Sequence, residues 1–212
     1  DDNNHLTYTI KFSFTLVPSQ KTYVYLKIPC IVTYKFFISG EINIDYNIKF
    51  PYNMPPPPRI GLRTSISSNF SNVSWLGYGP HEAYDDRKNC VYLGYFKSSI
   101  IDLHTSYIVP QECGRRHDPR WISFLDYHTQ HGIHIIPHRS SINSSSSSLS
   151  WGWSASPYSL ETLENTLHNH ELEPDSDNRI HIHIDRMMMG LGGYDSWSPN
   201  VSDEFLIPTN CE

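Results

Sequence analysis

Apolar and polar residues alternate strictly from residue 42 to residue 50, and no other feature limits the possible fold of this chain as firmly. Successive side chains of a β-strand point to opposite faces, so every second residue of this segment can lie on one inward face. The apolar positions are Ile42, Ile44, Tyr46, Ile48 and Phe50. Gly40 fits a hairpin turn from a preceding strand over residues 33–38. The segment therefore predicts an antiparallel hairpin with its apolar face turned inward.

Short strand-like segments separated by turn residues recur along the rest of the chain. Residues 8–16 alternate in the same way, and further strands are expected at residues 59–65, 73–78 and 91–97. Four consecutive prolines at 55–58 supply no N–H donors, so they interrupt sheet pairing and form a rigid connection. Short strands joined by turns, without long helices, are typical of an all-β antiparallel sandwich.

One short helix is expected, over residues 160–168. Ser159 can cap its first turn, and Leu160, Leu163 and Leu167 fall on one face that would pack on the sheet. A helix of this length is not stable alone, so it depends on that packing. Residues 140–150 include eight serines and predict an exposed, mobile loop.

The composition argues against two classes of partner. The chain has 22 acidic and 16 basic residues and a net charge of −6, which does not favour binding to nucleic acid. No apolar run is long enough to span a membrane. The first five residues lack the basic region of a signal peptide, so we expect a cytoplasmic protein. A length of 212 residues fits one large domain or two small ones.

The spacing of cysteines and histidines predicts no metal site. The cysteines are Cys30, Cys90, Cys113 and Cys211. They are far apart and form no C-x-x-C pair, so we expect free thiols. His181, His183 and Asp185 share one face of a strand-like segment, but alternate residues lie about 7 Å apart, too far to share a metal easily. We expect them to form a polar, outward face, and we expect no ligand role for His168 or His170.

Four motifs carry most of the functional information. They are P-R-I-G-L-R at 58–63, G-P-H-E-A-Y-D-D-R-K at 79–88, the segment from Y-I-V-P-Q-E-C-G at 107 to D-P-R-W ending at 121, and G-L-G-G-Y-D-S-W-S-P at 190–199. In this order they resemble the C-terminal domain of the large β-galactosidases of glycoside hydrolase family 2. That domain is also found as the small chain of split β-galactosidases.

The resemblance covers residues 31–207 and implies a domain over 31–212, preceded by a lead-in over 1–30 that has no motif. It implies a large antiparallel sandwich of the galactose-mutarotase-like supersandwich type with one short helix. The family continues into a final strand beyond the position of Glu212, so that strand is expected to be missing. An unpaired sheet edge would then remain.

The resemblance also implies a function. In the family, two catalytic glutamates lie on a barrel domain, and nothing in this sequence resembles that barrel, so no catalytic residue is expected here. The chain would complete the sugar site of a retaining enzyme that hydrolyses terminal β-D-galactosides such as lactose. Its partner would be the barrel-containing domain or large chain. No cofactor is expected in this chain, because the magnesium and monovalent cation of the family enzyme are bound elsewhere.

The resemblance assigns one sugar-contacting residue, Trp197. Gly190, Gly192 and Gly193 would shape its loop, and Asp195 would anchor it through backbone amides, as short acidic side chains do in turns. Eight residues of the other motifs are expected to support the loop: His81, Glu82, Tyr84, Asp86, Arg87, Glu112, Asp118 and Arg120.

The charged clusters in these motifs have two interpretations. Paired carboxylates among Glu82, Asp85 and Asp86 can perform the acid–base chemistry of retaining glycosidases. A carboxylate beside an arginine such as Arg87 is more typical of a charge-assisted pair that fixes a loop, and we favour that interpretation. A second cluster, Glu112, Arg115, Arg116, Asp118 and Arg120, is expected to form a structural and interdomain network.

Three residues depart from the family pattern: Tyr194 replaces Asp or Asn, Asp85 replaces Pro and Cys113 replaces Asn. The first of these changes affects the hydrogen bonds expected in the loop of Trp197.

Two other functions stay open at this stage. One is an aldose-epimerase-like enzyme using His81 with Glu82 or Glu112. The other is a stand-alone carbohydrate-binding protein or an inactive fragment. A buried Trp197, with Trp151 or Trp153 contacting the sugar instead, is the alternative for the site.

Overall fold

The computed structural model describes residues 7–18, 25–52, 54–138 and 150–209. The chain divides into two compact units, one formed by residues 1–56 and 208–212 and the other by residues 57–207. The division falls within the four prolines, where sheet pairing is interrupted. Most of the serine run, residues 139–149, lies outside the described residues.

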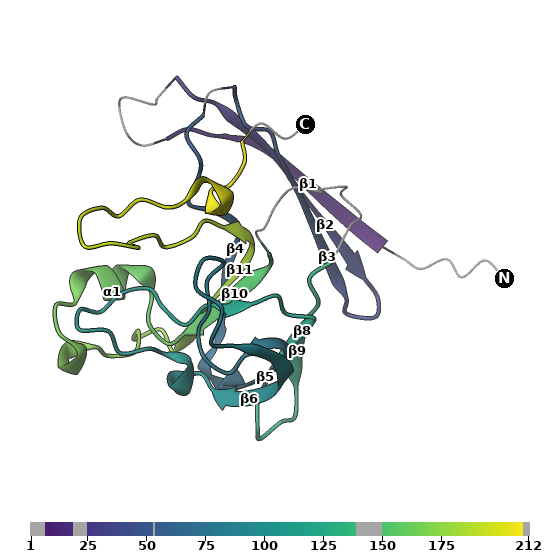
Figure 1. Cartoon of the computed structure of the whole chain (residues 1–212). Coiled ribbons are helices and arrows are strands. Elements are labelled where there is room, and N and C mark those ends of the chain that lie inside the picture. The colour runs from purple at the N-terminus through teal and green to yellow at the C-terminus, as the bar shows by residue number, and fades with distance from the viewer. Residues whose placement is uncertain (1–6, 19–24, 53, 139–149, 210–212) are drawn as a thin grey trace. The chain divides into compact units, whose positions relative to one another are not determined.

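The first unit contains a three-stranded antiparallel sheet, drawn from purple to blue in Figure 1. Its strands are β1 (Thr7–Leu16), β2 (Ile28–Phe37) and β3 (Ile42–Ile48), in the order β1-β2-β3. Gly40, with a φ of 87°, turns the chain between β2 and β3, and its N–H donates to the carbonyl of Phe37. The hairpin predicted around Gly40 is confirmed.

The register of this sheet gathers apolar side chains on one face. Tyr8 lies opposite Phe36, Ile10 opposite Tyr34, and the pattern continues through the next strand pair, where Tyr34 lies opposite Ile44. The prediction that the apolar face of residues 42–50 lies inward is wrong for its first half. Ile42 and Ile44 are 52% and 41% exposed, because the described part of the first unit contains one sheet and no second layer over that part of its face.

The second unit is a sandwich of two four-stranded antiparallel sheets, which confirms the expected all-β sandwich. One sheet has the order β4 (Arg59–Ser67), β11 (Arg179–Met188), β10 (Gly152–Ser156) and β7 (Arg116–His117). The other has the order β6 (Tyr92–Ser99), β5 (Asn72–Gly79), β8 (Trp121–Leu125) and β9 (Gly132–Ile135). All neighbouring strands in both sheets are antiparallel.

The core of the sandwich is formed by inward side chains of both sheets. Val73 and Trp75 of β5 and Phe124 of β8 meet Trp153 of β10 and Ile182 of β11, and each is at most 2% exposed. The rings of Trp75 and Trp153 pack edge to face, with centroids 5.4 Å apart. Large buried aromatic residues contribute most of the apolar area in such a core, so these two tryptophans are its main stabilising contacts.

One α-helix is present in the described part of the chain, α1 (Leu160–Asn165), and the Ser159 hydroxyl caps it by accepting from the N–H of Thr162. Leu163 is buried as predicted. Leu167 is 69% exposed, because the helix ends at Asn165, two residues before the position that would place Leu167 on the packed face. None of the described helices is long and apolar enough to cross a membrane.

Short 3-10 helices lie in four of the described connections. They are η2 (Ser68–Phe70), η3 (Ile101–Leu103), η4 (Asn169–Glu171) and η5 (Asp203–Phe205).

Candidate functional site

The loop that follows β11 carries Trp197 and depends on glycine for its path. Gly192 and Gly193 have φ values of 69° and 68°, in the left-handed region that side chains disfavour. A Cβ added to Gly192 would lie 2.4 Å from the carbonyl oxygen of Asn200. Only glycine therefore allows the two arms of the loop to approach each other at this point.

Asp195 holds the tip of this loop. Its Oδ1 accepts hydrogen bonds from the N–H groups of Trp197 and Ser198, at 2.7 and 2.8 Å. The bond from Trp197, followed by that from Ser198, lowers the pKa of Asp195, so the side chain is a carboxylate at neutral pH. The turn leaves the Trp197 side chain 93% exposed. The indole is therefore open to a ligand.

The other two candidate tryptophans are less accessible. Trp153 is fully buried in the core and cannot contact a ligand. Trp151 is half-buried, and the guanidinium of Arg186 lies 5.6 Å from its ring centroid. Among these three tryptophans, Trp197 has the most accessible indole.

Asp86 fastens the base of the loop to the segment that follows β5. Its Oδ2 accepts from the N–H of Gly192 at 2.9 Å and from the hydroxyl of Tyr194 at 3.1 Å. Tyr194, the residue that departs from the family pattern, thus supplies a hydrogen bond to the loop. Gly190 leaves room for this contact, because a Cβ there would lie 2.5 Å from the same oxygen. Asp86 and the glycines act together to fix the loop.

The segment around Glu82 is itself tied down. Tyr84 and Arg87 exchange two backbone hydrogen bonds, and the Arg87 guanidinium lies 5.3 Å from the centroid of the Tyr84 ring. The Glu82 carboxylate accepts from the N–H of Gly114 at 2.7 Å and from the Tyr107 hydroxyl, and it lies 3.8 Å from Arg87. These contacts engage Glu82 in fixing loops, whereas His81 beside it is exposed.

A buried charge pair lies beneath this segment. The side chains of Asp85 and Arg115 are 0% and 3% exposed, and their charged atoms lie 3.4 Å apart. Burial raises the pKa of Asp85, and the Arg115 charge acts in the opposite direction. Ser150 donates to the other carboxylate oxygen at 3.1 Å. Asp85, which stands where the family commonly has proline, is therefore a structural partner of Arg115.

His117 completes this cluster as a neutral ring. Its Nδ1 lies 3.5 Å from Asp85, which would suit an ion pair. Burial, assisted by the charge of Arg115, lowers the pKa of His117 to about 3. The imidazole is uncharged at neutral pH, so its polar contacts are hydrogen bonds, such as that with the Ser150 hydroxyl at 3.0 Å.

A second network joins β4 to β11 and to Glu112. The Arg59 guanidinium lies 2.5 Å from the Glu112 carboxylate, 3.3 Å from Asp185 and 2.6 Å from the ring Nδ1 of His183. Burial raises the pKa of Asp185 to about 6, although Arg59 pulls it down. Burial, and then the Arg59 charge, lowers the pKa of His183. Glu112 thus contacts Arg59 and His183 of the sheet, and the expectation that it supports the Trp197 loop stays a prediction.

The prediction of an outward polar face on β11 is wrong. His183 and Asp185 are 7% and 1% exposed. β11 lies inside its sheet, between β4 and β10. The side chains of Leu160 and Leu163 line the same small cavity as His183, so the α1 segment covers this face. Burial of both faces is a tertiary effect that the alternation of residues did not reveal.

Arg116, Asp118 and Arg120 fix the turn before β8. The buried Arg116 guanidinium donates to the carbonyls of Leu103 and Gly114, at 2.9 and 2.6 Å. Burial lowers the pKa of Arg116 to about 10, so it stays charged at neutral pH. Asp118 has a φ of 45° and lies 3.5 Å from Arg120. These charges position backbone and do not converge on the Trp197 loop.

Sequence reasoning missed several residues of these networks. Arg59 lies in the first motif and Tyr107 in the third, yet neither was identified as a supporting residue. Their partners are 53 and 25 positions away along the chain. Their place within the motifs was the signal that could have identified them. Which residues they pair with depends on how the sheets fold. The described cysteines, Cys30, Cys90 and Cys113, are free thiols as predicted.

Comparison with known proteins identifies the family of the chain. A family model described as the β-galactosidase small chain matches residues 2–212. A β-galactosidase of Pseudoalteromonas haloplanktis is 36% identical over 170 residues, which are 80% of this chain and 14% of the relative. β-Galactosidase 2 of Enterobacter cloacae is 34% identical over 80% of this chain and 15% of its own length.

A β-galactosidase of Yersinia pestis is 32% identical over 82% of the chain. The chain thus spans about one seventh of the length of these relatives. The motif order, the sandwich fold and the family match agree, and the chain belongs to the β-galactosidase small-chain family.

Proposed function

We propose that this chain completes the sugar site of a β-galactosidase that hydrolyses terminal β-D-galactosides such as lactose. The observation that carries the proposal is the exposed indole of Trp197 on a loop held by Asp86 and Asp195. A fixed loop with an accessible aromatic side chain is suited to ligand contact, because little conformational entropy is lost on binding. Membership of the β-galactosidase small-chain family supports a galactoside as the sugar. It does not favour the epimerase-like or stand-alone alternatives.

Trp197 would act by binding and not by chemistry. An indole offers an apolar face to the C–H side of a pyranose ring and an N–H to a hydroxyl group. The contact would fall on the leaving-group or acceptor sugar at the mouth of the site. The acid–base and nucleophilic carboxylates of a retaining glycosidase would lie in the remaining part of the enzyme.

The proposed partner is therefore a barrel-containing domain or large chain. The relatives are about seven times longer than the segment they share with this chain, which leaves room for such a domain. Under this proposal the magnesium and monovalent cation of the enzyme also belong to that part. The charge networks around Asp85 and Arg59 would hold the loop-bearing unit rigid during the reaction.

The experiment is a complementation assay. The Pseudoalteromonas relative, lacking the region that matches this chain, is expressed with and without it, and hydrolysis of 2-nitrophenyl β-galactoside is measured. We expect no turnover by either part alone and turnover by the assembled pair. Turnover by the purified chain alone would contradict the proposal. So would an active pair whose sugar affinity is unchanged by Trp197→Ala.

A further inference from the structure

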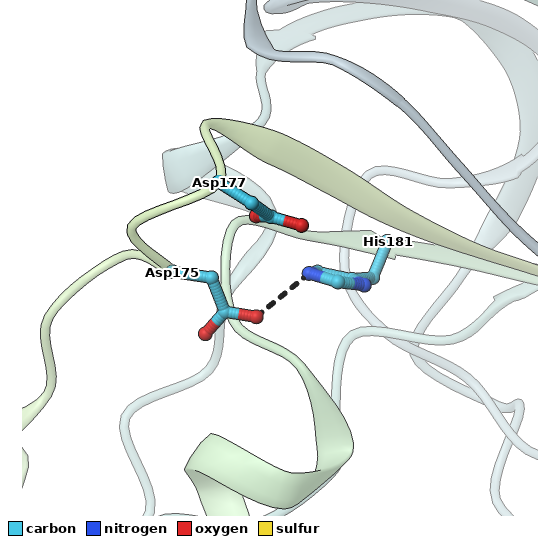
Figure 2. A group of neighbouring side chains, drawn as sticks. All are labelled: Asp175, Asp177 and His181. Atoms are coloured by element: carbon cyan, nitrogen blue, oxygen red, sulfur yellow. Dashed lines mark ion pairs between the residues drawn. The ribbon is translucent and has the colours of Figure 1, made fainter.

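Asp175, Asp177 and His181 bring three metal-ligating side chains together at one edge of the second unit. Each offers one ligand atom, and these atoms all lie within 4.8 Å of one another. Figure 2 shows both carboxylates beside the imidazole, with Asp175 and Asp177 in the turn before β11 and His181 in the strand itself. The group is distinct from the predicted strand-face set of His181, His183 and Asp185, because the two aspartates precede the strand.

The backbone holds this group in place. Asn178, with a φ of 53°, closes the turn, and its N–H donates to the carbonyl of Asp175 at 3.0 Å. His181 lies on the central strand β11, opposite Ser65 of β4 and Ser156 of β10. The donors therefore come from a closed turn and a strand paired on both sides, and two of them cannot move far apart.

Asp175 is fixed a second time through its side chain. Its Oδ1 accepts from the Thr162 hydroxyl of α1 at 2.5 Å, which leaves Oδ2 facing the imidazole. Asp177 is the movable member of the group, because its side chain is 51% exposed and lies 3.3 Å from the Nε of Arg179. A small rotation of Asp177 can bring its carboxylate to an ion without disturbing the fold.

The imidazole of His181 points its Nε2 toward the carboxylate of Asp175. Its side chain is 13% exposed, and its Nε2 has no exposed surface and makes no hydrogen bond. The same nitrogen lies 2.9 Å from Asp175 Oδ2, in the ion-pair contact that Figure 2 marks. A divalent cation placed between the two atoms would be bound by both, in place of this contact.

The donor set selects the class of cation. One imidazole nitrogen with two carboxylate oxygens suits zinc and similar divalent transition metals, which bind these atoms at about 2.0–2.2 Å. Neighbouring ligands of a tetrahedral zinc lie about 3.3–3.6 Å apart, so the 2.9 Å between His181 Nε2 and Asp175 Oδ2 would widen by roughly half an ångström on binding. The two carboxylates would balance the charge of the ion, and water would occupy the open position.

We propose that Asp175, Asp177 and His181 form a zinc site that joins the turn before β11 to the sheet. Through Thr162 the same ion would link α1 to β11. The proposed role is structural, since the site is built from elements that pack on one another and its ligands are separate from the loop of Trp197.

The test is calorimetric titration of the metal-free chain with zinc chloride. His181→Gln removes the nitrogen ligand, and Asp177→Asn removes an exposed carboxylate with little risk to folding. We expect each variant to weaken the tightest zinc binding roughly tenfold or more, the scale by which perturbed metal sites lose affinity. Circular dichroism of each variant verifies that the fold is retained.

His170→Gln is the matched control. His168 and His170 stack with ring centroids 5.5 Å apart and offer zinc a second place to bind near the same turn. We expect this control to leave the tightest binding unchanged. Zinc affinity that falls with His170→Gln but not with Asp177→Asn and His181→Gln would overturn the proposal. So would the same affinity in all four proteins, or no zinc binding at micromolar concentrations.

Discussion

The sheet of the first unit and the sandwich of the second share one sequence pattern and differ in burial. Along β1, Ile10, Phe12 and Phe14 alternate with polar residues and are 44–52% exposed. In the sandwich, Trp75 and Phe124 occupy equivalent alternating positions and are at most 1% exposed. Alternation thus determines which side chains share a face, whereas burial depends on a second layer placed over that face.

Buried and exposed ion pairs differ in the same way as buried and exposed apolar residues. Asp85 and Arg115 are buried against each other, whereas Arg63 and Glu161 form an ion pair with 44% and 68% of their side chains exposed. Burial removes water that would otherwise solvate each charge, so an unpaired buried charge is expensive. In the exposed pair, water compensates for the loss of either partner.

The largest expected loss of stability distinguishes the apolar face inside the sandwich from the apolar face of β1. Trp153→Ala should reduce the free energy of unfolding by about 3–5 kcal/mol, because it leaves a cavity in a closed core. Phe12→Ala should reduce it by less than about 1 kcal/mol, since that ring is 52% exposed. Urea denaturation followed by circular dichroism measures both. Equal losses would show that the face of β1 is covered in solution.

The buried charge pair gives the next effect. Asp85→Asn should reduce the free energy of unfolding by about 3 kcal/mol, because Arg115 then keeps a buried charge without its counterion. Glu161→Gln breaks the exposed pair with Arg63 and should cost less than about 1 kcal/mol. The same denaturation measurement compares them. A smaller loss for Asp85→Asn than for Glu161→Gln would contradict the burial of the pair.

His117 and Asp185 should both make the free energy of unfolding depend on pH, with opposite signs. The pKa of His117 in the folded chain is about 3, below its ordinary value. The contribution of His117 to the free energy of unfolding is therefore complete above about pH 6.5. It is lost as the pH falls toward 3, because the unfolded chain binds a proton that the folded chain does not. His117→Gln should flatten the stability profile between pH 6.5 and 4, by on the order of 2 kcal/mol.

Asp185 should change the pH dependence of stability in the direction opposite to His117. Its folded pKa is raised to about 6, so its contribution is complete below about pH 4 and is lost as the pH rises through 6. Asp185→Asn should therefore steepen the loss of stability on acidification. Unfolding curves between pH 4 and 7 measure the stability of both variants. Stability profiles that change slope in the same direction would refute the opposite effects assigned to His117 and Asp185.

The smallest effect is expected at the exposed loop. Trp197→Ala should leave the unfolding free energy of the chain within about 0.5 kcal/mol, because the side chain packs on little. In the assembled enzyme it should weaken sugar binding by on the order of 1 kcal/mol, the value of a specific aromatic contact. The KM for lactose and the rate of transfer to glucose measure this.

Tyr127→Ala provides the control for that loop, since Tyr127 is an exposed aromatic residue in another connection, 74% accessible. It should change neither binding nor stability. A loss of sugar affinity equal to that of Trp197→Ala would mean that exposed aromatic residues in general, and not this loop, govern binding.

Much of the candidate site was predictable as a set of segments but not as a set of contacts. The glycines around Trp197 and the acidic residue Asp195 form a local turn, and local turns follow from nearby residues. Asp86 was identified as a supporting residue, yet its bonds to Gly192 and Tyr194 span more than 100 positions of the chain. Such pairings depend on strand order, which the motifs do not specify.

The sequence by itself determined the strands of the first unit, the strands β4, β5 and β6 of the second, the hairpin at Gly40, the cap at Ser159 and the family, because each depends on side-chain alternation or on short motifs. Only the tertiary structure decided what is buried. It covered His183 and Asp185, left Ile42 and Ile44 exposed and brought Asp175 to His181. Burial and long-range pairing depend on which surfaces meet, and no local pattern of residues contains that information.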